Sequence, residues 1–174
     1  MGIQFETDYN METLTAMDKS LRKTVRRKRS RRVHIFAAVV LVLGILTILA
    51  TVSGGEPLGA SGVVTLLAML VVILVSLFED RLNAWFARKR LLPGTEHAAA
   101  TFEEDGYVSA TSMSESKFSY AQIVAVAETA RYFVFALSSH HTQAYDKRNI
   151  RGGSVEDFRA FIAEKTGKPV EEIK

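Results

Sequence analysis

Two uncharged stretches in the first half of the chain constrain its fold more than any other feature. Residues 33–52 and 58–78 contain no Lys, Arg, Asp or Glu. An α-helix rises about 1.5 Å per residue, so each stretch can cross the roughly 30 Å apolar core of a bilayer. In a chain of 174 residues, too little sequence remains to bury two wholly apolar helices in a soluble core. The sequence therefore predicts two transmembrane helices.

The flanks of the two stretches predict their orientation. Residues 53–57, Ser-Gly-Gly-Glu-Pro, break the helix, and so short a connection predicts an antiparallel hairpin. Basic residues lie before the first stretch and after the second, whereas the connection has none. The positive-inside rule then predicts a multi-pass protein of the cell inner membrane with both termini cytoplasmic. Trp85 and Phe86 are expected to anchor the chain at headgroup level.

The basic residues near the hairpin are assigned to topology and to contact with anionic lipid. They are Arg22, Lys23, Arg26, Arg27, Lys28, Arg29, Arg31, Arg32, Arg88, Lys89 and Arg90. Each juxtamembrane Lys or Arg gains about 1 kcal/mol from anionic headgroups, which accounts for the cluster without a nucleic-acid partner. A cleaved signal peptide is disfavoured because the apolar stretch is too long and a second one follows directly.

The N-terminal segment carries two further patterns. Leu14, Met17, Leu21 and Val25 recur at helical spacing, which predicts an amphipathic helix from about residue 11 that leads straight into the first span. Residues 3–7 alternate like a strand and can add an edge to a sheet formed by the C-terminal part of the chain.

After Pro93 and Gly94 the pattern changes to short alternating segments, which predicts a separate domain. Strands are expected at residues 98–103, 107–112, 117–120, 123–128, 132–137 and 142–145. Asp105-Gly106 predicts a hairpin turn between the first two. A C-terminal helix is expected after Ser154, which can form a capping box with Asp157, and Gly167 can end that helix.

These patterns divide the chain into consecutive parts. We expect a strand and basic juxtamembrane helix (1–32), transmembrane helix 1 (33–52), an extracytoplasmic loop (53–57), transmembrane helix 2 (58–78), a basic aromatic linker at the membrane interface (79–94) and a cytoplasmic domain (95–174). The expected fold class is an α+β membrane protein. It combines a two-helix hairpin with a small antiparallel sheet and a C-terminal capping helix.

No cluster of residues predicts catalysis, and we expect no metal and no cofactor. His140 and His141 are adjacent, so on a strand they point to opposite faces, and the chain has no Cys to complete a site. Ser154 would need Gly at position 156 to form a G-x-S-x-G nucleophile turn, but Glu156 stands there. A hydrolase that uses His140, His141 or Ser154 is therefore the weakest of the functional alternatives.

The order of these elements matches a known family pattern. The residues that carry the match are Phe5, Tyr9, Thr101-Phe102, Asp105-Gly106, Phe118-Ser119-Tyr120, Ile123, residues 126–129, residues 132–135, Lys147-Arg148 and Asp157-Phe158. In these positions the chain resembles the YcxB-like family of bacterial membrane proteins. The resemblance implies a cytoplasmic domain similar to pleckstrin-homology (PH) domains, a partly open barrel capped by a C-terminal helix. It implies no enzymatic activity.

Lys147, Arg148 and Arg151 lie between the last strand and the final helix. They are candidate contacts for a partner or a lipid headgroup, and the alternative, which the sequence favours, is a solvated loop with no binding role. The leading hypothesis is a non-catalytic scaffold or regulatory module that binds an unidentified protein or anionic lipid. The alternative is an accessory subunit of a transporter or membrane enzyme that acts through the hairpin. Small residues such as Gly44 and Gly62 give the hairpin close-packing surfaces, which would also permit a homo-oligomer.

Overall fold

A computed structural model describes residues 2–174 of the chain. The backbone separates into two compact units. One unit, Lys28–Leu82, is helical, and we call it the helical pair. The other combines the residues up to Arg27 with Asn83–Lys174, and we call it the sheet unit. The sheet unit thus combines the segment expected as a domain, residues 95–174, with segments that precede it, of which the sequence offered residues 3–7 as an edge strand.

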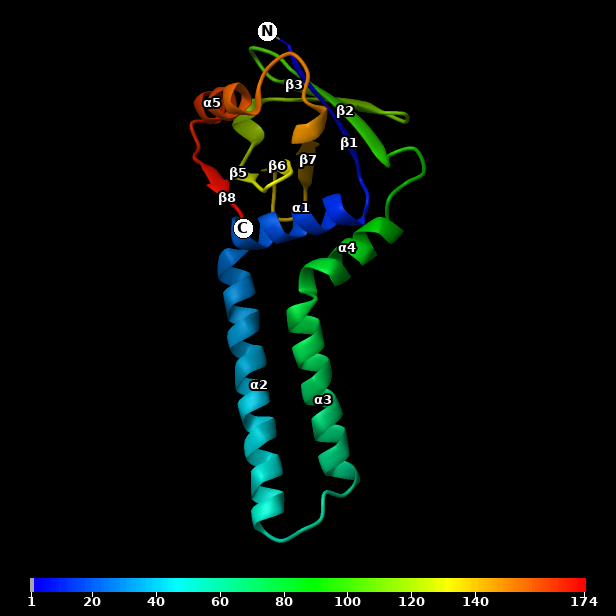
Figure 1. Ribbon diagram of the computed structural model, residues 1–174, viewed down its shortest axis with the longest axis vertical. Coiled ribbons are helices and arrows are strands. Elements are labelled where there is room, and N and C mark those ends of the chain that lie inside the picture. The colour runs from blue at the N-terminus through cyan, green and yellow to red at the C-terminus, as the bar shows by residue number, and fades with distance from the viewer. Residues whose placement is uncertain (1) are drawn as a thin grey trace. The chain divides into compact units, whose positions relative to one another are not determined.

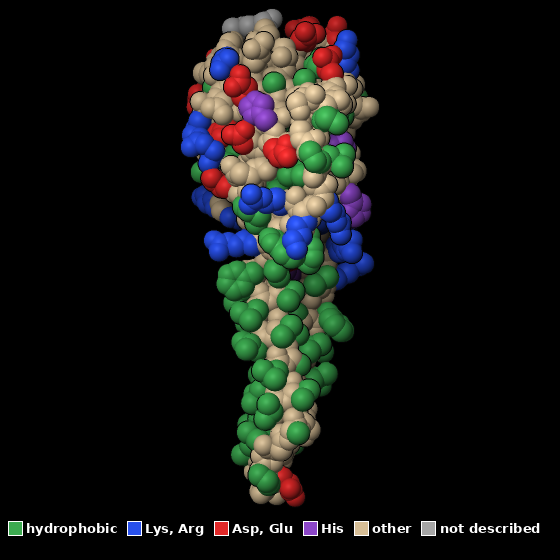
Figure 2. All heavy atoms as spheres, turned by 90° about the vertical axis from the view of Figure 1, so that its right-hand side faces the viewer, with side chains coloured by type: hydrophobic (Ala, Val, Ile, Leu, Met, Phe, Trp, Pro, Cys, Tyr) green, Lys and Arg blue, Asp and Glu red, His purple; other side chains and the backbone are tan. Residues whose placement is uncertain are grey.

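The helical pair consists of α2 (Arg27–Ser53) and α3 (Ala60–Leu77), which run antiparallel (Figure 1). Both helices are long and apolar enough to cross a membrane. None of the described side chains of α2 is buried, and Figure 2 shows hydrophobic side chains over the visible face of the pair. The two helices approach closely at Gly44, where a Cβ atom would lie 2.7 Å from Sδ of Met69.

The predicted amphipathic helix forms, but it does not continue straight into the first apolar helix. Helix α1 (Met11–Lys23) begins at Asn10, whose side chain accepts hydrogen bonds from the N–H groups of Glu12 and Thr13. At Thr24 the backbone leaves the helical conformation, and the N–H of Arg26 donates to the carbonyl of Leu21 instead. This turn separates α1 from α2. The predicted linker after α3 likewise contains a helix, α4 (Glu79–Lys89).

The first sheet has four antiparallel strands in the order β1-β2-β3-β4. They are β1 (Ile3–Asp8), β2 (His97–Phe102), β3 (Tyr107–Thr111) and β4 (Glu115–Phe118). The N-terminal segment does add an edge strand, with Ile3 opposite Phe102 and Asp8 opposite His97. The predicted Asp-Gly hairpin is confirmed, since the N–H of Glu103 donates to the carbonyl of Gly106 over 2.9 Å.

The second sheet has the order β7-β6-β5-β8, so the sheet unit holds two sheets where one was expected. Its strands are β5 (Ala125–Glu128), β6 (Tyr132–Ala136), β7 (Thr142–Asp146) and β8 (Val170–Glu172). Strand β8 was not predicted, and it pairs parallel to β5. Over the described residues the two sheets do not join into a closed barrel. Short 3-10 turns occupy Tyr120–Gln122 and Lys147–Asn149.

Helix α5 (Val155–Thr166) follows the predicted signals closely. The Ser154 hydroxyl accepts a hydrogen bond from the N–H of Asp157 over 3.0 Å, and the Asp157 carboxylate accepts one from the N–H of Ser154 over 3.1 Å. Gly167 ends the helix with φ of 61°, in the left-handed region that glycine adopts without strain. The capping box places Phe158 and Ile162 in the core.

The core is mainly aromatic and draws on both ends of the chain. Its buried rings are Phe5, Phe102, Tyr107, Tyr120, Phe133, Phe135, Tyr145 and Phe158. The rings of Phe5 and Phe158 lie edge to face with centroids 4.7 Å apart. Helix α1 packs on β6 and β7, where Ala16 and Met17 contact a second buried cluster that includes Val134 (Figure 1). The N-terminal segment is therefore an integral part of the sheet unit.

Substitution of Phe5 tests this conclusion. We expect Phe5→Ala to lower the free energy of unfolding of the sheet unit by about 3–5 kcal/mol, because it removes a buried ring and leaves a cavity. The measurement is thermal unfolding of the full chain, followed by near-UV circular dichroism. Val124→Ala, at an exposed position, is the control and should change stability by less than about 0.5 kcal/mol. Equal unfolding of the two variants would contradict the assignment of β1 to the core.

Candidate functional site

The three cations predicted to contact a partner have different surroundings. Lys147 begins the 3-10 turn after β7, and its Nζ donates to Oε1 of Glu128 over 2.9 Å. The Lys147 side chain is only 14 % exposed. From α5, Arg159 donates to both carboxylate oxygens of Glu128 over 2.6 and 2.7 Å. Hydrogen bonds from Arg159 lower the pKa of Glu128, burial opposes them, and Lys147 adds to the lowering. Lys147 therefore holds β5 to the turn.

Arg148 and Arg151 present their guanidinium groups to solvent, with side chains 64 % and 68 % exposed. Arg148 is held by Asp146, and Arg151 lies 3.2 Å from a carboxylate oxygen of Glu6. The backbone of Arg151 is fixed on β1, since its N–H and carbonyl both pair with Gln4 over 2.9 Å. A guanidinium group has five N–H donors, so each arginine keeps donors for a further anion.

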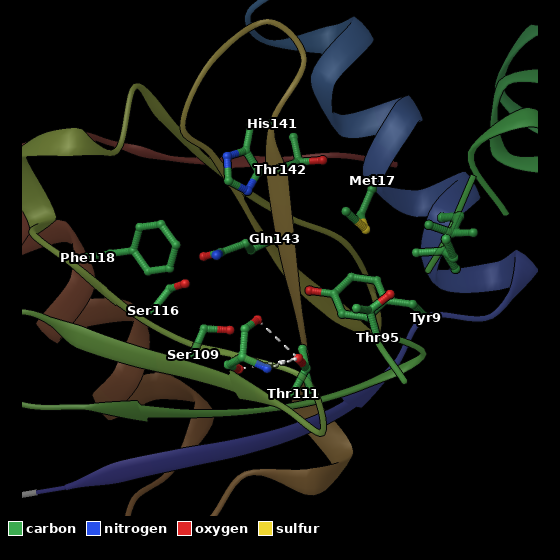
Figure 3. A pocket seen from close by; sticks show the side chains of 14 residues that line it. Tyr9, Met17, Thr95, Ser109, Thr111, Ser116, Phe118, His141, Thr142 and Gln143 are labelled. Carbon is green, nitrogen blue, oxygen red and sulfur yellow. Dashed lines mark hydrogen bonds between the residues drawn. The ribbon is translucent and has the colours of Figure 1, made fainter. Parts of the chain in front are cut away.

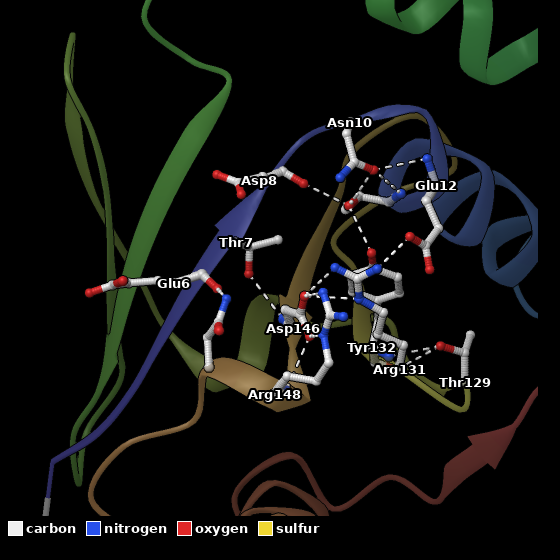
Figure 4. Close-up of polar contacts among 12 residues, drawn as sticks. Glu6, Thr7, Asp8, Asn10, Glu12, Thr129, Arg131, Tyr132, Asp146 and Arg148 are labelled. Atoms are coloured by element: carbon white, nitrogen blue, oxygen red, sulfur yellow. Dashed lines mark hydrogen bonds and ion pairs between the residues drawn. The ribbon is translucent and has the colours of Figure 1, made fainter.

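A buried carboxylate organises the region beside these arginines (Figure 4). The side chain of Asp146, at the end of β7, is 4 % exposed and accepts hydrogen bonds from Arg131 over 2.8 and 3.0 Å. Arg131 also pairs with Glu12 of α1. The N–H of Asp146 donates to Oγ1 of Thr7 over 3.0 Å. Asp146 thus ties the turn that bears Arg148 to β1 through its backbone N–H, and to α1 through its carboxylate and Arg131.

Two further arginines, Arg26 and Arg90, line a pocket of about 400 Å³ between α1, α4 and the loop before β7. Arg26 reaches across it, with Nε donating to the carbonyl of Ser139 over 2.6 Å and one Nη 3.2 Å from Nδ1 of His140. Asp18 balances the positive charge of Arg26, since a carboxylate oxygen of Asp18 lies 3.3 Å from the guanidinium group. Asp18 also accepts a hydrogen bond from the side chain of Asn83 over 2.9 Å. Leu14, Met17, Leu21, Ala84, Phe86, Ala87 and Thr142 complete the lining.

The other predicted interface residues lie at the ends of helices. Arg22 and Lys23 are in the last turn of α1, and Arg88 and Lys89 are in the last turn of α4. Exposed cations at the start of α2 are Arg27, Lys28, Arg29, Arg31 and Arg32. Trp85 and Phe86 are both exposed on α4, where Nζ of Lys89 lies 3.6 Å from the Trp85 ring centroid.

The residues weighed for catalysis have local roles in the structure. The Ser154 hydroxyl donates to Asp157 over 2.6 Å within the helix cap. His140 faces Arg26, whereas the ring of His141 packs edge to face against Phe118. Among the described residues, no group of three or more His, Asp or Glu side chains is placed to hold a metal ion.

The sequence did not indicate which carboxylates pair with the basic residues of the sheet unit, and so did not indicate which basic residues stay exposed. Glu128 pairs with Arg159 across 31 positions, and Arg131 pairs with Asp146 across 15. The one available signal was the position of Glu128 at the end of an apolar strand, where a buried acid requires a cation. Asp18 and Asn83 are likewise brought together from segments 65 positions apart.

Comparison with known protein families matches residues 102–162 to the YcxB-like protein family. This match confirms the resemblance over the stretch that runs from the end of β2 into α5. It covers Lys147, Arg148 and Arg151, and it does not include the helical pair or β1. Searches of curated proteins and of solved structures find no match.

Substitution of Glu128 tests the buried ion pairs. We expect Glu128→Gln to lower the free energy of unfolding by about 2–4 kcal/mol at neutral pH, because it leaves Lys147 and Arg159 without their charged acceptor. The fold lowers the pKa of Glu128 below its ordinary 4.5. The contribution of ionised Glu128 to the free energy of unfolding is therefore complete above the ordinary pKa. It is lost as the pH falls through the lowered pKa of the folded state.

Thermal unfolding between neutral pH and about pH 3 measures both effects, a window that brackets the ordinary Glu pKa. The wild type should lose stability through this acidic range more steeply than Glu128→Gln. Glu115→Gln, which removes an exposed carboxylate on β4, is the matched control and should follow the wild type. Parallel pH curves for the wild type and Glu128→Gln would show that the ion pairs add nothing.

Proposed function

We propose that this is an integral inner-membrane protein with two spans, whose sheet unit is a non-catalytic scaffold or regulatory module that captures a protein partner at the cytoplasmic face. One observation carries the proposal. The segments before and after the helical pair form a single folded unit, joined by the β1–β2 ladder. A ladder of backbone hydrogen bonds does not form across a bilayer, so both segments belong on the same side of any membrane that α2 and α3 cross.

The charge distribution supports a cytoplasmic location for that side. Exposed cations from Arg27 to Arg32 begin α2, and Arg81 and Arg88 follow α3, whereas residues 54–59 between the helices contain no Lys or Arg. Such asymmetry favours retention of the charged ends in the cytoplasm. The exposed rings of Trp85 and Phe86 fit the headgroup region of the same leaflet.

The sheet unit supports a role in recognition. Its two four-stranded sheets and the helix α5 over their shared aromatic core favour a PH-like description of the fold. Arg148 and Arg151 are exposed, and the Asp146 network and the pairing with Gln4 hold their backbone in place. Two exposed guanidinium groups on a backbone held in place, with N–H donors that remain available, suit an acidic surface on a protein partner. Lys147 is excluded from this surface by its pairing with Glu128.

Labelling of single cysteines tests the topology, because the wild-type chain contains no Cys and gives no background. We expect a membrane-impermeant maleimide to label Glu56→Cys in right-side-out vesicles and exposed Met113→Cys only in inside-out vesicles. Charged reagents do not cross the apolar core, so the two positions should respond oppositely. Labelling of both positions in the same vesicles, or the reverse pattern, would contradict the proposed orientation.

Affinity capture from native membranes tests the recognition surface. We expect Arg148→Gln/Arg151→Gln to recover the protein partner at least about tenfold less than the wild type, since two charge-assisted contacts are lost. Lys117→Gln/Lys168→Gln removes the same net charge from positions outside this surface and should recover the partner normally.

The hairpin alternative predicts a different outcome. A side chain at Gly44 would collide with Met69, so Gly44→Leu should disturb the packing of α2 on α3 while the sheet unit stays intact. Loss of the partner in Gly44→Leu, with normal recovery in Arg148→Gln/Arg151→Gln, would favour an accessory subunit that acts through its spans. It would overturn the role proposed for the two arginines.

A further inference from the structure

The inner face of the first sheet changes abruptly from large to small side chains. Residues opposite one another on neighbouring strands form rows on this face. One row contains Phe102, Tyr107 and Phe118, which are all aromatic. The next row replaces them with Ala100, Ser109 and Ser116. Small side chains in a row that faces the core leave space that the aromatic row fills.

This space is a groove of about 310 Å³, which we call the hydroxyl-lined groove (Figure 3). Ser109, Thr111, Ser116 and Phe118 form its floor, Thr142 and Gln143 of β7 form one wall, and Tyr9, Leu14 and Met17 form another. Leu91, Thr95, Ala98, Ser114 and His141 complete the lining. Its volume lies at the lower end of the range for small-molecule sites. All of these residues belong to the sheet unit.

Gln143 aims an unpartnered donor into this groove. The residue is only 7 % exposed, and its Oε1 accepts hydrogen bonds from the hydroxyls of Tyr107 and Tyr145 over 2.7 and 2.8 Å. Burial raises the pKa of both tyrosines, which keeps their hydroxyls protonated as donors. Those two bonds fix the amide with Nε2 on the opposite side. Within residues 2–174, Nε2 has no hydrogen-bond partner, and Figure 3 shows the amide pointing toward the side of Ser116 and Phe118.

The Gln143 side chain is nearly buried, but its Nε2 is not among the buried unpaired atoms of the described residues, so this donor is open to the groove and available to a ligand there. The hydroxyls of half-buried Ser109 and Thr142 and of exposed Ser116 make no hydrogen bond within the described part of the chain, and all three lie on the same groove. Thr111 and Thr95, by contrast, are satisfied by Ser114 and by the Leu92 carbonyl. None of the described residues that line the groove is Lys, Arg, Asp or Glu.

We propose that the hydroxyl-lined groove binds an uncharged small molecule rich in hydroxyl groups, such as a cyclic polyol. Nε2 of Gln143 donates to a ligand oxygen, and Ser109, Ser116 and Thr142 both donate to and accept from neighbouring hydroxyls. The ring of Phe118, in the floor of the groove, supplies an apolar surface for the carbon skeleton of the ligand. A charged ligand would have no counter-ion in this lining, so the groove selects against it. This site is independent of the partner surface at Arg148 and Arg151.

Saturation-transfer NMR on the full chain in phospholipid nanodiscs tests the proposal, with glycosidic detergents left out because they carry the same hydroxyl groups. The probes are myo-inositol and glucose at about 1 mM, in the range of weak small-ligand affinities. We expect transfer from the protein to one or both probes. Glucose 6-phosphate, which adds a dianion to the same ring, should receive at least about tenfold less.

Filling the groove supplies the decisive comparison. Ser109→Leu and Ser116→Leu place an apolar side chain in the groove without removing a hydrogen bond from the fold, and each should reduce transfer at least about tenfold. Lys117→Leu puts the same side chain on the opposite face of β4 and should leave transfer unchanged. The proposal is overturned by absence of transfer to both uncharged probes, by equal transfer to glucose 6-phosphate, or by transfer that persists in both groove variants while their unfolding temperatures match the wild type.

Discussion

Backbone hydrogen bonds between β1 and β2 join chain segments that the helical pair separates in sequence. The ladder runs from Ile3 opposite Phe102 to Asp8 opposite His97, and it carries Phe5 into the aromatic core. Arg151 then pairs with Gln4, and Asp146 with Thr7, so the turn before α5 is built on β1 as well. If β1 were absent, β2 would become an open edge and the surface that bears Arg151 would lose its support. The rest of the sheet unit depends on this single strand pairing.

The carboxylate partner of each basic residue at the turn after β7 determines whether that residue is buried or available for binding. Glu128 binds Lys147 and Arg159 in a largely buried cluster, where removal of one partner leaves an uncompensated charge. Asp146 is more deeply buried than Glu128, yet its partner Arg148 is exposed and keeps donors for a further anion. Three basic residues that look equivalent in the sequence thus divide into one structural lysine and two arginines suited to recognition. The presence of a basic residue in the sequence does not tell a structural cation from an exposed one, because the difference depends on how deeply the side chain and its partner are buried.

Local signals predicted the elements of this chain well. The two apolar runs, the Asp105-Gly106 turn and the capping box at Ser154 each depend only on residues that are neighbours in the sequence, and all of them appear in the structure. Strand β8 could not be foreseen, because three residues have no readable period and depend on pairing with β5. The turn at Thr24 and the Glu128 cluster likewise arise from contacts between distant segments. The groove exists only once Ser109 and Ser116 align across two strands, so its candidate role could be inferred only from the three-dimensional arrangement.

The pairing of β1 with β2 also sets an order of events during biosynthesis. Ile3 emerges from the ribosome first, but its partner Phe102 follows only after α2, α3 and α4 have been made. At about 5–20 residues per second, the N-terminal strand waits roughly 5–20 s for its partner. Through that interval its edge and the side chain of Phe5 remain open to other chains, including chaperones. Completion of the sheet unit therefore reports that the whole helical pair has been synthesised.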